Sequence, residues 1–101
     1  MKLYFVYIVQ CNDKSYYVGM TSNMEQRLNE HNSGKYPDAY TFSRRPVELK
    51  WIEQFTDPDI AMDWEKKLKG WSRKKKEALI LNDWDRLIRL SKNYTQFGKP
   101  K

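Results

Sequence analysis

The strongest constraint on the fold is a run of seven apolar residues near the start of the chain, Leu3 to Val9. A strand that is apolar at every position is buried on both faces, so we expect this one at the centre of a sheet. A turn around Asn12 then leads into a second apolar segment at residues 16–20, which predicts a hairpin. If the hairpin folds about Asn12, Tyr7 and Tyr17 lie opposite each other on one face.

The remaining elements are marked by their capping residues and by their periodicity. Residues 22–25 form a capping box and Gly34 fits just beyond a helix end, so a first helix is expected between them. Residues 47–55 alternate as a third, half-buried strand, with Leu49 and Trp51 directed inward. Asp57 before a proline starts a second helix, and Ser72 caps a third, which residues 82–83 can interrupt.

This order of elements predicts the fold class. The pattern ββαβαα indicates an α/β fold of the α+β type, with a small three-stranded mixed sheet flanked by helices. Residues 1–90 are expected to form one domain, and residues 91–101 a loose, polar C-terminal tail.

Cysteine and histidine counts exclude several kinds of site. Cys11 is the only cysteine and His31 the only histidine, so neither an intramolecular disulfide nor a zinc cluster is expected. No stretch reaches the length of a membrane span, and the N-terminal run lacks a small-residue cleavage site. We therefore expect a cytoplasmic protein that does not associate with membranes.

The excess positive charge is concentrated in one segment. The formal net charge is +6, yet residues 66–76 alone carry seven cations and no acid, so the rest of the chain sums to −1. Such a segment is either a solvated helix face or a surface that binds a polyanion, and we favour the polyanion. The predicted nucleic-acid-binding residues are Lys66, Lys67, Lys69, Arg73, Lys74, Lys75 and Lys76, together with Arg44 and Arg45 of an earlier loop.

Polar residues also fall on the inward faces of the first two helices. In the first helix, the arc that contains Met24 and Leu28 also contains Arg27 and His31, while Glu30 is expected to point away. Charged residues are rarely buried without a partner or a function, so this arc marks a candidate site.

In the second helix, Glu65 lies in the stripe defined by Ala61, Trp64 and Leu68. One interpretation of these inward residues is a structural ion pair between Arg27 and Glu65, although such pairs stabilise proteins poorly. The alternative, which we favour, is a functional site.

In this order, the residues resemble the GIY-YIG nuclease family. Phe5-Val6-Tyr7 aligns with the first triplet and Tyr17-Val18-Gly19 with the second, while Arg27, His31 and Glu65 fall on the family's arginine, histidine and metal-binding glutamate. The resemblance is to the small stand-alone members, which are similar to the catalytic domain of the excision-repair nuclease. Met20 stands where the repair nuclease has a lysine, and Asn82 is a candidate for the family's late asparagine.

The resemblance implies a metal-dependent endonuclease that acts on nucleic acid, DNA in preference to RNA, in repair or processing. It implies one Mg²⁺ or Mn²⁺ held by Glu65, a tyrosine base (Tyr7 or Tyr17) and Arg27 as the donor to the phosphoryl oxygens, with His31 orienting a tyrosine or moving a proton. Such a base needs a pKa well below about 10, and we expect Arg27 and the metal to lower it.

The loop at residues 35–45 mixes aromatic and basic side chains, among them Tyr36, Tyr40, Arg44 and Arg45. This composition fits stacking of unpaired bases and binding of phosphates, and it equally fits an ordinary loop held in place by its aromatics. Two rival functions remain open: a non-catalytic nucleic-acid-binding module that retains the fold, and a protein-interaction domain whose basic helix meets an acidic partner.

Overall fold

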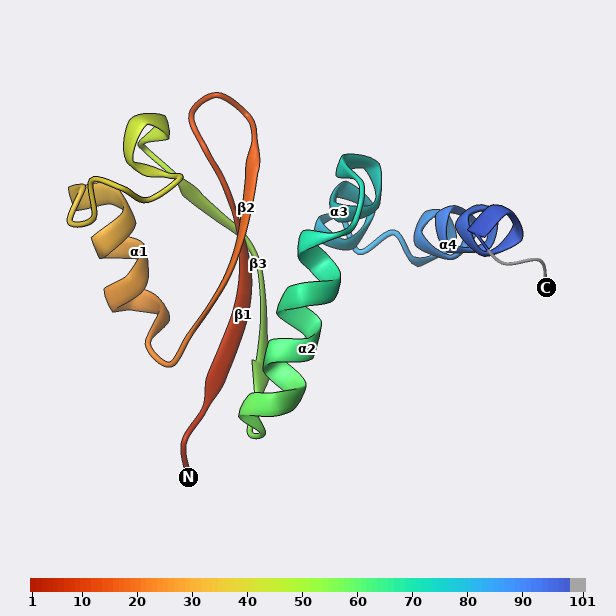
Figure 1. The fold of residues 1–101 in the computed structure, drawn as a ribbon, viewed down its shortest axis with the longest axis horizontal. Helices are drawn as coiled ribbons and strands as arrows, with labels where there is room; N and C mark the ends of the chain where they lie inside the picture. The colour runs from red at the N-terminus through yellow and green to blue at the C-terminus, as the bar shows by residue number, and fades with distance from the viewer. Residues whose placement is uncertain (99–101) are drawn as a thin grey trace. The chain divides into compact units, whose positions relative to one another are not determined.

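A computed structural model describes the backbone of residues 1–98 and the side chains of residues 1–91. The chain forms two compact units, the first ending at Gly70 and the second beginning at Trp71. The first unit holds the sheet and two helices, and the second holds two further helices (Figure 1).

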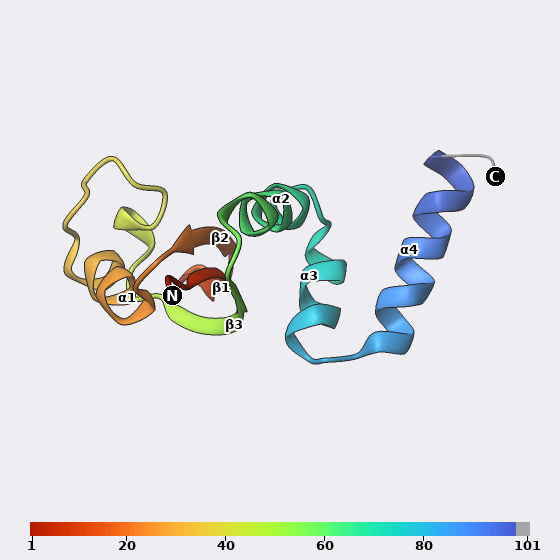
Figure 2. The same cartoon turned by 90° about the horizontal axis from the view of Figure 1, so that it is seen from below.

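The first unit is a three-stranded sheet with a helix on each face, in agreement with the predicted fold class. Strands β1 (Tyr4–Gln10), β2 (Tyr16–Thr21) and β3 (Glu48–Phe55) are arranged in the order β2-β1-β3. Helices α1 (Met24–Ser33) and α2 (Pro58–Lys69) cover opposite faces (Figure 2). Both strand pairings are antiparallel, so the sheet is not mixed. The two strands that run parallel to each other, β2 and β3, are separated by β1.

The central strand is buried on both faces, as its composition predicted. Val6, Tyr7, Ile8 and Val9 are all fully buried. Tyr7 and Val9 belong to a cluster with Leu28 of α1, whereas Val6 and Ile8 alternate with them and point to the face that α2 covers. The central strand therefore joins two apolar layers.

The register of the β1–β2 hairpin differs from the predicted one by two residues, because the loop is centred one residue later than expected. Tyr7 pairs with Gly19, and Tyr17 pairs with Val9, so the two tyrosines are diagonal neighbours rather than direct partners. The reason is the loop, which is centred on residue 13 and in which Lys14 has a positive φ of 73°. A hairpin loop of this length uses one left-handed residue to close.

Strand β3 contains an irregularity that the alternating pattern did not predict. Leu49 pairs with Val9 and Trp51 pairs with Ile8, with a register shift between the two pairs. Because paired residues share a face and Val9 and Ile8 point in opposite directions, Leu49 and Trp51 also do so. The bulge thus gives one large apolar side chain to each layer.

The helix boundaries follow from their caps, with one change. The Asn23 side chain, and not Ser22, caps α1 by accepting from the Gln26 amide at 3.0 Å, and Gly34 ends that helix with φ 74°. Asp57 caps α2 as predicted. In α2, Ala61 and Leu68 are buried, but Trp64 is 37% exposed, so it does not belong to the buried stripe.

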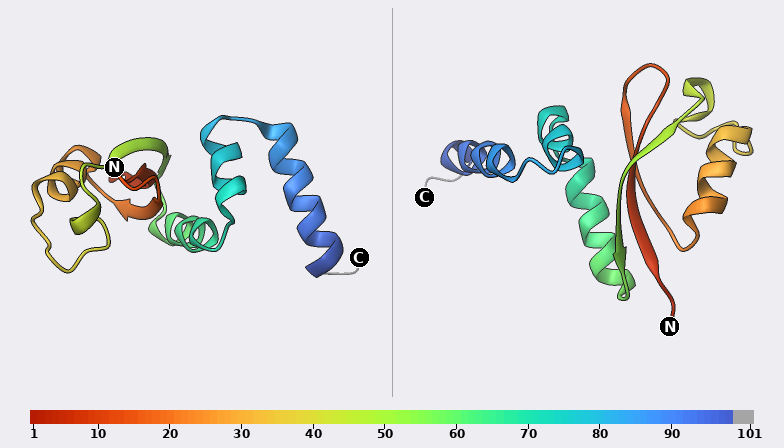
Figure 3. Two further views of the ribbon diagram at one scale, coloured as in Figure 1. Left: turned by 90° about the horizontal axis from the view of Figure 1, so that it is seen from above. Right: turned by 180° about the vertical axis from the view of Figure 1, so that it is seen from behind.

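The second unit consists of α3 (Arg73–Ile80), capped by Ser72, and α4 (Trp84–Gly98), seen end-on and side-on in Figure 3. The two helices are in contact, and Ala78 and Leu79 of α3 and Leu87 of α4 are buried. Asn82 interrupts them with a φ of 58°, a conformation that asparagine tolerates better than most residues. This backbone role accounts for an asparagine at that position.

The segment after Ser91, predicted to be a loose tail, is helical as far as Gly98. Residues 99–101 of that tail lie outside the described part of the chain. Among the helices of the described residues, none has both the length and the apolar character that crossing a membrane requires.

Candidate active site

Three buried side chains from three segments form a hydrogen-bonded chain. The Tyr7 hydroxyl lies 2.9 Å from His31 Nε2, and His31 Nδ1 lies 2.8 Å from Thr41 Oγ1. Tyr7 comes from the central strand, His31 from the inward arc of α1, and Thr41 from the loop that follows α1. All three side chains are at least 91% buried, so these hydrogen bonds lie inside the protein rather than at its surface.

Burial sets the protonation states of this chain. It raises the pKa of Tyr7 to about 12, because desolvation outweighs the opposing effect of the nearby Arg27 guanidinium. The expectation that Arg27 brings a tyrosine pKa below 10 is therefore not met at Tyr7. Burial also lowers the pKa of His31, and the Arg27 charge lowers it further, so the imidazole is neutral at neutral pH.

Gly19 provides the space that the Tyr7 hydroxyl occupies. A Cβ built on Gly19 would overlap the Tyr7 hydroxyl oxygen and lie 2.5 Å from the ring carbon that carries it. The paired position opposite Tyr7 therefore accepts only glycine while the tyrosine ring stays where it is. The glycine of the second triplet serves the tyrosine of the first triplet.

Tyr17 connects this chain to the loop. Its ring contacts the His31 ring edge-on, with centroids 5.5 Å apart, and lies 6.5 Å from the Tyr7 ring. Tyr40 stacks on Tyr17 at 5.9 Å with an interplanar angle of 18°, and the guanidinium carbon of Arg44 lies 3.9 Å over the Tyr40 ring. The structure thus brings Tyr7, Tyr17 and His31 together and adds Tyr40 and Arg44.

Arg27 is held at the rim of the site by α1 and β2. Its Nε donates to Glu30 Oε1 at 3.1 Å, and its Nη1 donates to the Met20 carbonyl at 3.4 Å. The side chain of Glu30, predicted to point outward, is only 11% exposed. Arg27 itself is 36% exposed, so it can reach an external ligand.

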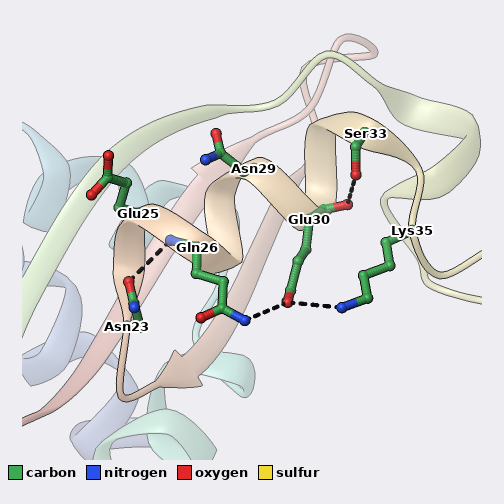
Figure 4. A pocket seen from close by; sticks show the side chains of 7 residues that line it. All are labelled: Asn23, Glu25, Gln26, Asn29, Glu30, Ser33 and Lys35. Carbon is green, nitrogen blue, oxygen red and sulfur yellow. Dashed lines mark hydrogen bonds and ion pairs between the residues drawn. The ribbon is translucent and has the colours of Figure 1, made fainter.

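A surface pocket runs along the outer side of α1, from Asn23 to Lys35, and Glu30 is part of its lining (Figure 4). In it, Glu30 Oε2 accepts from Gln26 at 3.0 Å and from Lys35 at 3.4 Å, while its other oxygen binds Arg27. The pocket lining includes neither Tyr7 nor His31. The pocket is connected to the site only through Glu30, which holds the Arg27 guanidinium in place.

Glu65 forms an ion pair with Lys69, at 3.0 Å, and not with Arg27. Its carboxylate is 19% exposed and close enough to Tyr7 to contribute to the raised pKa of that hydroxyl. Within the described residues, no group of three or more His, Cys, Asp or Glu side chains is arranged to hold a metal ion. A single carboxylate fits the oxygen chemistry of Mg²⁺ or Mn²⁺, which keep several waters, and does not fit zinc.

The predicted basic cluster is divided between the two units. Lys66, Lys67 and Lys69 belong to the first unit, and Arg73 to Lys76 belong to the second, where they begin α3. Several of these cations have local partners: Lys69 binds Glu65, and Arg73 binds Glu77 at 3.1 Å. The Lys75 ammonium lies 4.3 Å over the Trp71 ring. Of the two loop arginines, Arg44 binds Asp13 at 3.1 Å and Arg45 donates to the Phe42 carbonyl at 2.7 Å.

A model of the GIY-YIG catalytic domain matches residues 3–78, which include both triplets, Arg27, His31 and Glu65. The chain belongs to the GIY-YIG family. The matched residues include Tyr7 on β1, and Tyr17 and Gly19 on β2. The nuclease-like character of the family thus attaches to the part of the chain that holds the tyrosine–histidine pair.

Several relatives and solved structures are similar to this chain over most of their length. A UPF0213 protein of Syntrophus aciditrophicus is 45% identical over 83 residues, covering 82% of this chain and 95% of the relative. A UPF0213 protein of Staphylococcus haemolyticus is 44% identical, covering 79% and 96% of the two chains. The solution structure of EF2693 from E. faecalis shares 35% identity with a TM-score of 0.58, covering 81% and 86%. The solution structure of a UPF0213 protein from Bacillus halodurans shares 40% identity with a TM-score of 0.51, covering 77% and 82%.

Sequence reasoning did not select Gly19, Glu30 or Thr41 as site residues, and it named Tyr40 only as one aromatic of a loop that can stack bases. Gly19 carried a signal, because glycine inside a strand marks a place where other atoms approach closely. Glu30 is three residues from Arg27, a spacing at which side chains on a helix meet. Thr41 lies across a long loop from His31, and neither spacing nor composition indicates that contact.

Proposed function

We propose that this GIY-YIG protein is a metal-dependent endonuclease that hydrolyses phosphodiester bonds in nucleic acid, in DNA rather than RNA, during repair or processing in the cytoplasm. The observation that carries the proposal is the hydrogen-bonded chain from Tyr7 through His31 to Thr41, with Arg27 beside it. A neutral histidine that contacts a tyrosine hydroxyl, near a fixed arginine, is an arrangement suited to moving a proton during attack on a phosphate.

The protonation states support a relay through Tyr7. The Arg27 guanidinium can only donate hydrogen bonds, so the Tyr7 oxygen accepts from it. The Tyr7 hydroxyl proton is then free to be donated to His31 Nε2. The proton of the neutral imidazole is then on Nδ1, which donates a hydrogen bond to Thr41 Oγ1. As water attacks the phosphorus, its proton passes to the Tyr7 oxygen while the Tyr7 proton passes to His31. A tyrosine with a pKa of about 12 can act in this way because no free tyrosinate is formed.

Arg27 and Glu65 supply the remaining requirements. The forked guanidinium of Arg27, fixed by Glu30 and the Met20 carbonyl, can donate to the phosphoryl oxygens as negative charge accumulates on them. Glu65 would hold Mg²⁺ or Mn²⁺ once Lys69 moves away from it. When bound there, the ion would neutralise the phosphate and stabilise the leaving oxygen.

The test is cleavage of a panel of linear and branched DNA and RNA substrates with Mg²⁺ or Mn²⁺. Arg27→Ala and Glu65→Gln should each lower the cleavage rate at saturating substrate by about 10² or more, with binding largely retained. The exposed carboxylate Asp63 lies on the same helix as Glu65, so Asp63→Asn is a matched control that should cleave normally. A Glu65→Gln or Arg27→Ala variant with near wild-type cleavage would contradict the proposal.

A second candidate function is a non-catalytic nucleic-acid-binding module, and two observations favour it. Tyr7 is fully buried, so attacking water reaches its hydroxyl only if covering side chains move, and Glu65 already has a cationic partner in Lys69. This module would bind the same panel without cleaving any member of it at any Mg²⁺ or Mn²⁺ concentration. It would also melt at the same temperature with and without the metal, whereas a metal ion at a hundred times its Kd adds about 2.7 kcal/mol.

A further inference from the structure

A partly exposed stack of side chains lies next to the Tyr7–His31 pair, and the proposed chemistry assigns it no role. Tyr40 is 42% exposed, although its ring is stacked on Tyr17 and has the Arg44 guanidinium over it. The Arg44 side chain is itself 35% exposed. A large ring that serves only to pack is normally covered more fully than this. The stack therefore has surface available for another flat group.

The loop holds this stack in a fixed orientation. Arg44 donates to Asp13 at 3.1 Å and, through Nη1, to the Tyr40 carbonyl at 2.7 Å. Thr41, which follows Tyr40 in the sequence, is hydrogen-bonded to His31. The Asn12 amide donates to the Arg44 carbonyl at 2.8 Å. Because these contacts already order Tyr40 and Arg44, a ligand that stacks on them loses little additional conformational freedom.

The chemistry of the stack selects its ligand. Nucleobases stack on aromatic rings and on arginine guanidinium planes, and this binding tolerates any base because each has a π-face. A base inside an intact duplex is already stacked on its neighbours and is not available to a side chain. We propose that Tyr40 and Arg44 form a stacking site for an unpaired nucleobase of the substrate. This proposal rests on the proposed action on nucleic acid.

The position of the site relates it to the chemistry. The Tyr17 ring, on which Tyr40 is stacked, contacts the His31 ring and lies next to the Tyr7 ring. A base bound at Tyr40 is thus separated from the proton-relay pair by two aromatic rings, those of Tyr40 and Tyr17. A phosphate of the same nucleotide strand can be directed toward that pair. The site would favour cleavage next to an unpaired nucleotide.

The experiment measures binding in EDTA, where no cleavage occurs, with oligonucleotides that carry the fluorescent base 2-aminopurine. Three probes are compared: a single strand, a duplex with one unpaired 2-aminopurine, and a fully paired duplex. We expect the first two probes to bind more tightly and to show quenched emission. Tyr40→Leu should weaken their binding about 5- to 150-fold, without changing the slope of log K against log salt, since no phosphate contact is removed.

Matched variants separate stacking from other effects. Tyr40→Phe keeps the ring and should bind as wild type, while Arg44→Lys keeps the charge but removes the guanidinium plane and should weaken binding. Tyr36 lies in the same loop and is 51% exposed, with Lys35 rather than Tyr17 against its ring, so Tyr36→Leu should have little effect. Arg44→Lys provides the decisive comparison if Tyr40→Leu fails to fold in a thermal melt.

Tighter binding of the single strand would support the site and indicate a single-stranded base as its ligand. Tighter binding of the duplex with one unpaired base would also support the site and indicate a base extruded from a duplex. Equal binding of the paired duplex, or wild-type binding by both Tyr40→Leu and Arg44→Lys, would overturn it. A wild-type protein that binds through Tyr40 but cleaves nothing with Mg²⁺ or Mn²⁺ would refute the proposed hydrolysis and leave the stacking site intact.

Discussion

Replacement of Gly19 by alanine tests whether the second triplet exists to position the tyrosine of the first. The added Cβ would overlap the Tyr7 hydroxyl oxygen and lie 2.5 Å from the ring carbon that carries it, closer than real Cβ atoms come to other atoms. The Tyr7 ring must therefore move, and its 2.9 Å hydrogen bond with His31 Nε2 is broken. Overpacking costs about 1–3 kcal/mol and an orphaned buried acceptor about 1–3 kcal/mol. We expect Gly19→Ala to lower the unfolding free energy by about 2–6 kcal/mol in total.

The assay is urea unfolding of a double-mutant cycle. In a Tyr7→Leu background the far end of the ring is absent, so Gly19→Ala should cost about 1–3 kcal/mol less than it does in the wild type. Gly70→Ala is the matched control, because a Cβ at that position meets the Lys67 and Lys66 carbonyl oxygens at ordinary distances of 3.6 and 3.9 Å. This role of Gly19 would be refuted if Gly19→Ala were as stable as wild type, or if its cost were the same in both backgrounds.

Three further predictions follow from the charged groups. The pKa of His31 is below its ordinary 6.5 in the folded state, so the unfolded chain binds more protons at low pH. The contribution of His31 to the unfolding free energy is therefore fully present above pH 6.5 and is lost as the pH decreases below that value. A His31→Gln variant whose unfolding free energy has the same pH dependence as wild type would exclude this histidine as the cause. Because Glu65 pairs with Lys69 and not with Arg27, Glu65→Gln in EDTA should change the unfolding free energy by no more than about 0.5 kcal/mol. A decrease of about 3–5 kcal/mol would instead indicate an orphaned buried partner. Replacing Lys74, Lys75 and Lys76 by glutamine should weaken binding of all sequences and flatten the salt slope by about 0.7–0.9 for each phosphate that is no longer neutralised, with cleavage at saturating substrate retained; an unchanged slope would assign the nucleic acid to another surface.

Local patterns were sufficient to predict the elements and several of their contents. The apolar run at residues 3–9 predicted a strand buried on both faces, and Asp57, Ser72 and Gly34 marked the helix ends where the structure has them. The helical period placed His31 on the inward face of α1, where it is 9% exposed. These features act within a few residues, so capping residues and periodicity predict them without knowledge of the rest of the chain.

The same patterns were less informative where a residue's environment depends on distant segments. The period placed Trp64 in the buried stripe of α2, but the sheet leaves it 37% exposed. Glu30 was placed on the outer face of α1, yet its long side chain turns toward Arg27 and is 11% exposed. Arg27 and Glu65 were identified as charged groups in need of partners, and only packing decided that these partners are Glu30 and Lys69.

The sequence by itself determined the strands, the helix ends, the inward histidine and the family to which the triplets belong. Tertiary structure decided the hairpin register, the bulge that separates Leu49 from Trp51, and the contact between His31 and Thr41. It also decided the direction of the Tyr7 pKa, because burial by segments far apart in the chain outweighs the neighbouring arginine. The physical reason is range. Propensity, capping and periodicity are properties of neighbouring residues, whereas register, burial and the polarity around a buried hydroxyl depend on segments that only the folded chain brings together.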